Sequence, residues 1–272
     1  MHHYLNLPEN SGDTNVLREI CEFIICKSDP DTIFYSEETT GNKKNFLVVA
    51  YLKTSVSEDN LLFQEISKKY PKHLIAGFTI DHTEKQLDRG NLFFTANCNL
   101  GKMLYHNEIS DHYFGPEFLN TSELLRRARY FFDLEHKRIN AFTEGAAFYL
   151  KSGNLANAML SLHNAGEILL TQMEMILMGD RLFSHSLLEH SRFINRYPGR
   201  FPFLFEASEI TTDQLLLALD NAFITVRYGE EYKLPENLHD NALKFIRELH
   251  KSVVALFTRK HEHCVQINKL KN

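Results

Sequence analysis

The sequence predicts an α+β protein, with a small mixed sheet in its first part and an antiparallel helical bundle in its second. Two observations support this division. Short apolar or alternating runs rich in Val, Ile and Phe, which are typical of strands, all occur in the first part. Beyond it, apolar residues recur every three to four positions, as in helices that face a core. We therefore expect two domains, 1–115 and 116–272, each long enough to bury its own core.

The first domain is expected to begin with an amphipathic helix, because apolar side chains within 16–27 recur with a helical period. A second, shorter helix is expected over 58–70. Four further runs have the composition of strands, and they cover 31–36, 44–53, 73–80 and 91–97. This order of helices and strands predicts a small mixed sheet with helices packed on it.

The second domain is expected to be helical throughout. One long helix, continuous or broken, is predicted over 122–153, and Asn154 is expected to begin the next helix. In that next helix, apolar residues from Leu155 to Leu177 recur so that one side faces a core. Three more helices are predicted, at about 186–196, 212–226 and 236–260. Together these segments predict an antiparallel bundle.

Composition excludes several classes of protein. Hydrophobic residues make up 43% and charged residues 24%, which is typical of a folded globular chain. No apolar run reaches the roughly 18 residues of a membrane span, and the first residues lack the order of a secretory signal. We therefore expect a cytoplasmic protein with no membrane partner. A net charge of −5 does not favour broad attraction to nucleic acid, so any anion site must be local.

The helix that begins near Asn154 carries polar side chains next to its apolar side. His163, Glu167 and Glu174 fall on one stripe at 3.6 residues per turn, and this stripe borders the core. Taken alone, His163 and Glu167 indicate an ordinary helix-surface pair worth about 0.2–0.5 kcal/mol. The residues that follow along the chain change this interpretation.

His163 and Glu167, then a loop histidine, His185, and then the step Arg227-Tyr228 occur in an order and spacing that resembles the HEPN domain. This domain is a helical bundle named for nucleotide binding in higher eukaryotes and prokaryotes, and the resemblance covers about 130 to 260. It implies a ligand-binding role for His163, Glu167, His185, Arg227, Tyr228 and Lys233.

Two interpretations of these residues stay open. In the functional one, Arg227, Lys233 and a histidine bind a phosphate by charge-assisted hydrogen bonds, and the ring of Tyr228 stacks on a base. In the structural one, His185 caps the following helix, Glu167 pairs with Arg227 across the bundle, and Tyr228 closes the core.

The first domain resembles the minimal nucleotidyltransferase-like domain that often accompanies HEPN, in which a strand ending in Gly-Ser precedes a strand with Asp-x-Asp. Ser36 keeps its place, but Tyr35 stands where the glycine is expected, and Lys44 and Phe46 stand where the aspartates would be. Nucleotidyl transfer needs carboxylates to hold Mg²⁺, and neither lysine nor phenylalanine can ligate a hard cation. We therefore expect a degenerate motif with no metal or other cofactor, and loss of transferase activity.

The two resemblances imply a non-catalytic or weakly active protein of the nucleotidyltransferase–HEPN, toxin–antitoxin-like type. Its ligand would be a nucleotide or RNA, and it would form a homodimer through the helical bundle. One alternative is a metal-independent ribonuclease, in which arginine stabilises charge and histidine transfers protons. Arg129 and His136 keep the family's ribonuclease spacing but lie in the entry helix, which leaves Arg227 and His239 as weak catalytic candidates. The other alternative is a protein-interaction module with no small ligand.

Overall fold

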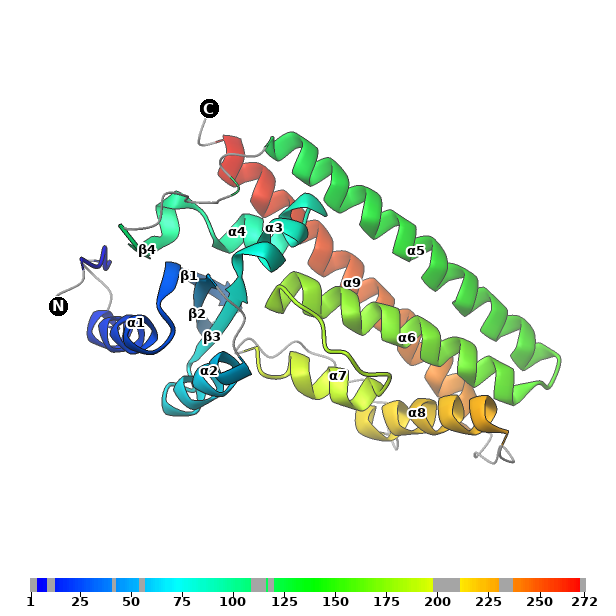
Figure 1. The fold of residues 1–272 in the computed structure, drawn as a ribbon. Coiled ribbons are helices and arrows are strands. Elements are labelled where there is room, and N and C mark those ends of the chain that lie inside the picture. The colour runs from blue at the N-terminus through cyan, green and yellow to red at the C-terminus, as the bar shows by residue number, and fades with distance from the viewer. Residues whose placement is uncertain are drawn as a thin grey trace. The chain divides into compact units, whose positions relative to one another are not determined.

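The computed structural model describes residues 4–8, 13–40, 43–53, 57–108, 116, 120–197, 211–229 and 237–269. Contacts group the chain into two compact units, which we call the sheet unit (Met1–Arg127 with Cys264–Asn272) and the helical unit (Ala128–His263). The predicted α+β class is confirmed, because a four-stranded sheet lies near the N-terminus and the C-terminal region is mostly helical (Figure 1). None of the helices in the described ranges has the length and apolar character needed to cross a membrane.

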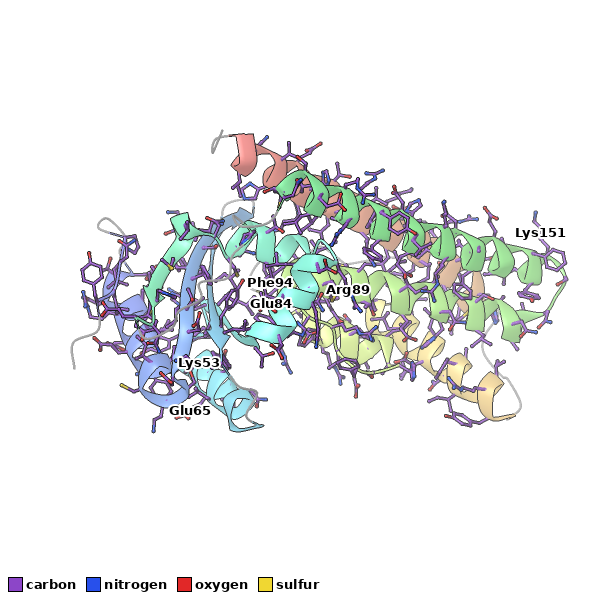
Figure 2. All side chains as sticks on the ribbon, turned by 45° about the horizontal axis from the view of Figure 1, so that its top comes forward. Lys53, Glu65, Glu84, Arg89, Phe94 and Lys151 are labelled. Atoms are coloured by element: carbon purple, nitrogen blue, oxygen red, sulfur yellow. The ribbon has the colours of Figure 1, made fainter. Side chains whose placement is uncertain are left out.

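The sheet has the strand order β3-β2-β1-β4. β1 (Pro30–Thr40) and β2 (Lys43–Leu52) form an antiparallel hairpin, and β4 (Met103–His106) pairs antiparallel with β1 on its other side. β3 (His73–Thr79) runs parallel to β2. Lys53 follows the end of β2 (Figure 2).

Helix α1 (Thr14–Ser28) and helix α2 (Ser57–Lys69) contribute to the core of this sheet. The buried side chains of α1 include Leu17, Ile20 and Ile24, which lie on one side of the helix because they are three to four residues apart. They belong to one apolar cluster with strand residues such as Ile33, Val48 and Ile75.

The strand predicted for 91–97 is wrong, because α4 (Leu92–Asn97) is a helix. The side chain of Asn91 caps it by accepting a hydrogen bond from the backbone N–H of Phe93 at 2.9 Å. All six residues of α4, including the polar Thr95 and Asn97, are buried, so the run has no exposed side and shows no helical period. A second helix that the sequence did not indicate, α3 (Ile80–Asp88), precedes it and is capped by Thr79.

The helical unit is built from α5 (Thr121–Lys151), α6 (Leu155–Met178), α7 (Leu187–Ile194), α8 (Thr212–Tyr228) and α9 (Asn237–Lys269), although the first turns of α5 and the end of α9 belong to the sheet unit. The expected start of α6 is confirmed, since the side chain of Asn154 accepts a hydrogen bond from the N–H of Asn157. α9 continues beyond the predicted end near residue 260.

The apolar side of α6 forms the centre of the helical unit. Leu162, Ala165, Leu169 and Met173 are fully buried, as their spacing predicts. Gly166 lies among them at a close approach, because a Cβ atom there would come within 3.1 Å of side chains from α7 and α9. α6 therefore packs against its neighbours on the side that also carries His163 and Glu174, both of which are buried.

Candidate functional site

The loop between α6 and α7 is held in place by a buried histidine. His163 lies on α6, and its Nε2 donates a hydrogen bond to the carbonyl oxygen of His185 at 2.9 Å. Its Nδ1 is buried and makes no hydrogen bond within the part of the chain that the structure describes. Because a carbonyl oxygen can only accept, Nε2 carries the hydrogen of this contact. His163 therefore fixes the backbone of the loop histidine.

Asp220, on α8, also holds this loop, through hydrogen bonds to the residues at the start of α7. Its carboxylate accepts hydrogen bonds from the hydroxyl of Ser186 at 2.7 Å and from the backbone N–H groups of Leu187 and Leu188 at 2.8 and 3.3 Å. Burial alone would raise the pKa of Asp220, but hydrogen bonds from His163 and from these three groups outweigh it, so the pKa lies below its usual value. Asp220 thus caps α7 as an anion placed at a helix N-terminus.

A second buried pair holds the start of the loop. Glu174, on α6, lies 2.7 Å from Nδ1 of His190, on α7, and also accepts a hydrogen bond from the N–H of Leu182 at 2.9 Å. Nε2 of His190 donates to the carbonyl oxygen of Ser184 at 3.0 Å. Because both ring nitrogens face acceptors, the contacts favour the charged form of the imidazole. Burial, the largest single cause, lowers the pKa of His190, but the hydrogen bond and charge of Glu174, the carbonyl of Ser184 and the charge of Glu167 together raise it by more, so the net shift is upward.

Near these buried groups, several side chains of α6, α8 and the loop between α6 and α7 are exposed or partly exposed. Glu167 places its two carboxylate oxygens 3.2 and 3.3 Å from Nδ1 of His185, so Nε2 of that exposed ring points away from the carboxylate. The ring of Phe223, on α8, lies 4.4 Å from the ring of His163 and 5.4 Å from that of His185. The guanidinium of Arg227 stands over the same Phe223 ring at 5.3 Å. We call Glu167, His185, Phe223, Arg227 and Tyr228 the α6–α8 surface.

The structure brings together His163, Glu167, His185 and Arg227, all of which were proposed from the sequence. Tyr228 directly follows Arg227 at the end of α8. Lys233 lies outside the described residues. His239, on α9, is buried.

The structural interpretation of these residues is wrong in three details. Ser186, not His185, caps α7 through its side chain. Glu167 pairs with His185 rather than with Arg227, because the loop histidine comes closer than the end of α8. The ring of Tyr228 is 71% exposed, so it does not close the core.

A separate groove of about 690 Å³ runs between α5 and α9. Arg247 and His250 of α9 line it, together with acidic residues such as Glu144 of α5. Nε2 of His250 lies 2.8 Å from Nδ1 of His136, and burial followed by the charge of His136 lowers the pKa of His250. Because the groove carries basic and acidic side chains in similar numbers, it has no strong preference for an anion.

In the sheet unit, Ser36, Lys44 and Phe46, the positions that were compared with the nucleotidyltransferase motif, each contact other side chains or backbone groups. Lys44 lies 3.4 Å from a carboxylate oxygen of Glu37. The ring of Phe46 lies between those of Tyr35 at 6.4 Å and His73 at 5.1 Å. Ser36 is buried, and its hydroxyl donates to the carbonyl oxygen of Asn97 at 3.5 Å. Over the described ranges, no three His, Cys, Asp or Glu side chains are grouped so that they could hold a metal ion.

Sequence reasoning missed Asp220, Phe223 and His190. The sequence signal for Asp220 was a charged residue within the apolar run of α8, and the signal for His190 was a histidine in the first turn of α7. Comparison with known proteins adds no further assignment, since no protein-family model and no curated protein matches the chain.

Proposed function

We propose that the protein binds a nucleotide or a short RNA on the α6–α8 surface, and that it is of the nucleotidyltransferase–HEPN type. One observation carries this proposal. The imidazole of His185 and the guanidinium of Arg227 approach the same ring, Phe223, at 5.4 and 5.3 Å, and both groups remain exposed. Two groups that can bind phosphate therefore lie near the same aromatic ring.

Each side chain of this surface has a separate task in binding. Arg227 donates charge-assisted hydrogen bonds to a phosphate, and its position over Phe223 limits the rotamers that it must give up. His185, held at Nδ1 by Glu167, presents Nε2 to the same ligand. The exposed ring of Tyr228 is available for stacking on a base, a contact worth about 1–3 kcal/mol.

The sheet unit, in this proposal, no longer performs metal-dependent transfer. Support comes from Phe46, whose ring is stacked between two other rings at a position where the related domains carry a carboxylate. Lys44 pairs with Glu37, and the described residues contain no group of three His, Cys, Asp or Glu side chains that could hold a metal ion. We therefore assign the protein a regulatory role like that of toxin–antitoxin relatives, without a cofactor. We also propose that two copies pair through the helical bundle.

Fluorescence anisotropy tests the binding site, with labelled ATP and a labelled single-stranded RNA of about ten nucleotides as probes. We expect Arg227→Ala to weaken binding at least tenfold, because a hydrogen bond to a charged group contributes about 1.5–3 kcal/mol. Arg89→Ala is the matched control: it removes an exposed arginine from α3's end, labelled in Figure 2, and should leave binding unchanged.

Two results would contradict this assignment. Absence of binding to either probe at low salt would favour the interaction module with no small ligand. Binding that is unchanged in Arg227→Ala but lost in Arg247→Ala would move the site to the groove between α5 and α9.

A metal-independent ribonuclease is the second candidate, because a carboxylate-oriented imidazole beside an arginine is also a suitable arrangement for proton transfer and charge stabilisation. It predicts cleavage of RNA in EDTA that Arg227→Ala and His185→Ala both abolish. The binding proposal predicts no cleavage. His239→Ala tests the other candidate pair, Arg227 and His239. Because His239 is buried, we expect this substitution to affect folding rather than cleavage.

A further inference from the structure

Helix α5 carries a row of exposed side chains along one side. Phe131, Leu134 and Phe148 are 43%, 44% and 67% exposed, which is unusual for large apolar residues. Together with three residues between them they alternate at intervals of three and four, the spacing of a coiled-coil contact. We call this row the α5 seam; it consists of Phe131, Leu134, Arg138, Ala141, Gly145 and Phe148. The end of α5 is marked by Lys151 in Figure 2.

Gly145 has no function in the fold of the single chain. A Cβ atom built on it meets nothing within 4 Å, and it lies inside a regular helix. Glycine in a helix interior costs about 0.5–1 kcal/mol relative to alanine. With Ala141 one turn before it, Gly145 leaves a shallow hollow on the outer side of α5. Such a hollow fits a large side chain from another helix.

Some charged residues beside the seam have ion-pair partners and others do not. Most charged residues of α5 have an ion-pair partner, as Arg138 does with Glu135 at 2.8 Å and Arg129 with Asp133 at 3.1 Å. Lys151 at the end of the helix makes no ion pair or hydrogen bond within the described ranges, and neither do Lys137 and Glu144 beside the seam. They are seven residues apart and so lie on the same flank of the seam.

We propose that α5 pairs with α5 of a second copy of this chain, in antiparallel orientation. Phe131 then meets Phe148 of the second copy, and Leu134 enters the hollow at Gly145. Lys137 faces Glu144 of the second copy, and the two-fold symmetry makes this contact twice. The inference rests on the proposed pairing of two copies, and it is independent of the nucleotide site.

Charge selects this arrangement over its neighbours. A shift by one heptad in one direction places Lys137 opposite Lys137, and a shift in the other direction places Glu144 opposite Glu144. A parallel pair would put Lys137 next to Phe142 and Glu144 next to Tyr149, with no opposite charge for either. Like charges directly opposed destabilise a contact, so the one remaining register is favoured.

The size of the contact sets its strength. The seam covers about five turns of one helix, which places it at or below the smaller end of specific interfaces, about 1,200 Å². Arg138 lies near Ala141 of the second copy, where its long side chain reaches the edge and keeps its pair with Glu135. We therefore expect a dimer that dissociates in the micromolar range.

Sedimentation equilibrium of the full chain tests the proposal over a range of concentrations. The unmodified protein should dimerise, and Lys137→Glu and Glu144→Lys should each weaken the dimer at least tenfold, because each creates two like-charged contacts. The double variant K137E/E144K exchanges the two charges and should restore dimerisation to within threefold of the original. Both positions are on the helix surface, and circular dichroism should confirm that each variant is folded.

The matched controls are Lys85→Glu and Glu84→Lys on α3, which change the net charge equally at exposed positions of the sheet unit (Glu84 is labelled in Figure 2). Neither should affect the dimer. A chain that stays monomeric at several hundred micromolar overturns both this inference and the proposed pairing. A dimer that tolerates both single variants, or one that the double variant fails to restore, overturns the inference and leaves pairing through another surface.

Discussion

His73 in the sheet unit and His190 in the helical unit are both buried, yet their pKa values are shifted in opposite directions. Neither ring nitrogen of His73 makes a hydrogen bond in the described ranges; the ring stacks on Phe46, and burial lowers its pKa. Burial acts in the same direction on His190, but Glu174, the carbonyl of Ser184 and Glu167 together outweigh it. The surroundings of one histidine therefore favour a neutral ring within an aromatic stack, and those of the other favour its charged form.

The difference shows that neighbours, rather than residue type, decide what a polar side chain does in each unit. In the sheet unit, the rings of Tyr35, Phe46 and His73 stack in a row. In the helical unit, buried charges are kept and satisfied by partners, as between Glu174 and His190. Substitutions of the two kinds of buried group should therefore have very different costs.

The largest effect is expected for Glu174→Ala. It leaves the His190 cation without its anion and the N–H of Leu182 without its acceptor, and removing one member of a buried pair costs about 3–5 kcal/mol. The free energy of unfolding from urea denaturation measures this loss. Glu248→Ala, which breaks an exposed pair with Lys251, should change it by less than about 1 kcal/mol. A loss below 1 kcal/mol for Glu174→Ala would contradict the buried pair.

Asp220→Asn should cost less, about 1.5–3 kcal/mol, because an amide of the same size keeps only part of the hydrogen bonding to Ser186, Leu187 and Leu188. Protection of the Leu187 and Leu188 amides from hydrogen exchange should fall with it. Unchanged protection at these two amides would show that Ser186 alone holds the start of α7.

The contributions of His190 and His73 to stability should depend on pH in opposite directions. The folded-state pKa of His190 lies above its ordinary 6.5, so its contribution to stability is present below pH 6.5 and is lost as pH rises through the folded value. The folded-state pKa of His73 lies below 6.5, so its contribution is present above pH 6.5 and is lost as pH falls toward the folded value. Titration of the two imidazoles by NMR should give midpoints on opposite sides of 6.5. Midpoints on the same side would remove the contrast.

The smallest effect is expected for His73→Phe, a substitution that keeps an aromatic ring and removes nitrogens that have no partner in the described ranges. Unfolding free energy should change by less than about 1 kcal/mol, since volume-conserving apolar replacements are tolerated well. His190→Phe is the matched comparison, because it leaves Glu174 buried without its cation and should cost several times more.

Much of the helical unit was predictable from spacing. The apolar side of α6, its start at Asn154 and the polar stripe with Glu167 beside the core all follow from a 3.6-residue period. The partners of that stripe were not predictable. Glu174 pairs with His190 sixteen residues later, and His163 approaches Asp220 on a different helix, contacts that no local period encodes.

The sheet unit was harder to predict where an apolar run lacks any period. The run 91–97 has the composition of a buried strand, and only the cap at Asn91 distinguishes it as a helix. Phe223 was missed because an aromatic residue in an amphipathic helix indicates a core position, whereas here its ring lies between His163 and Arg227. The resemblances to HEPN and nucleotidyltransferase-like domains stay predictions.

Two side chains hold the connection between α6 and α7: His163 of α6 bonds the carbonyl of His185, and Asp220 of α8 accepts from the N–H of Leu187. A ligand that reaches His185 therefore meets a backbone whose shape is already set. Little disorder has to be removed on association, so binding should resemble the docking of rigid bodies, with an on-rate limited by diffusion and orientation rather than by a slow closing step.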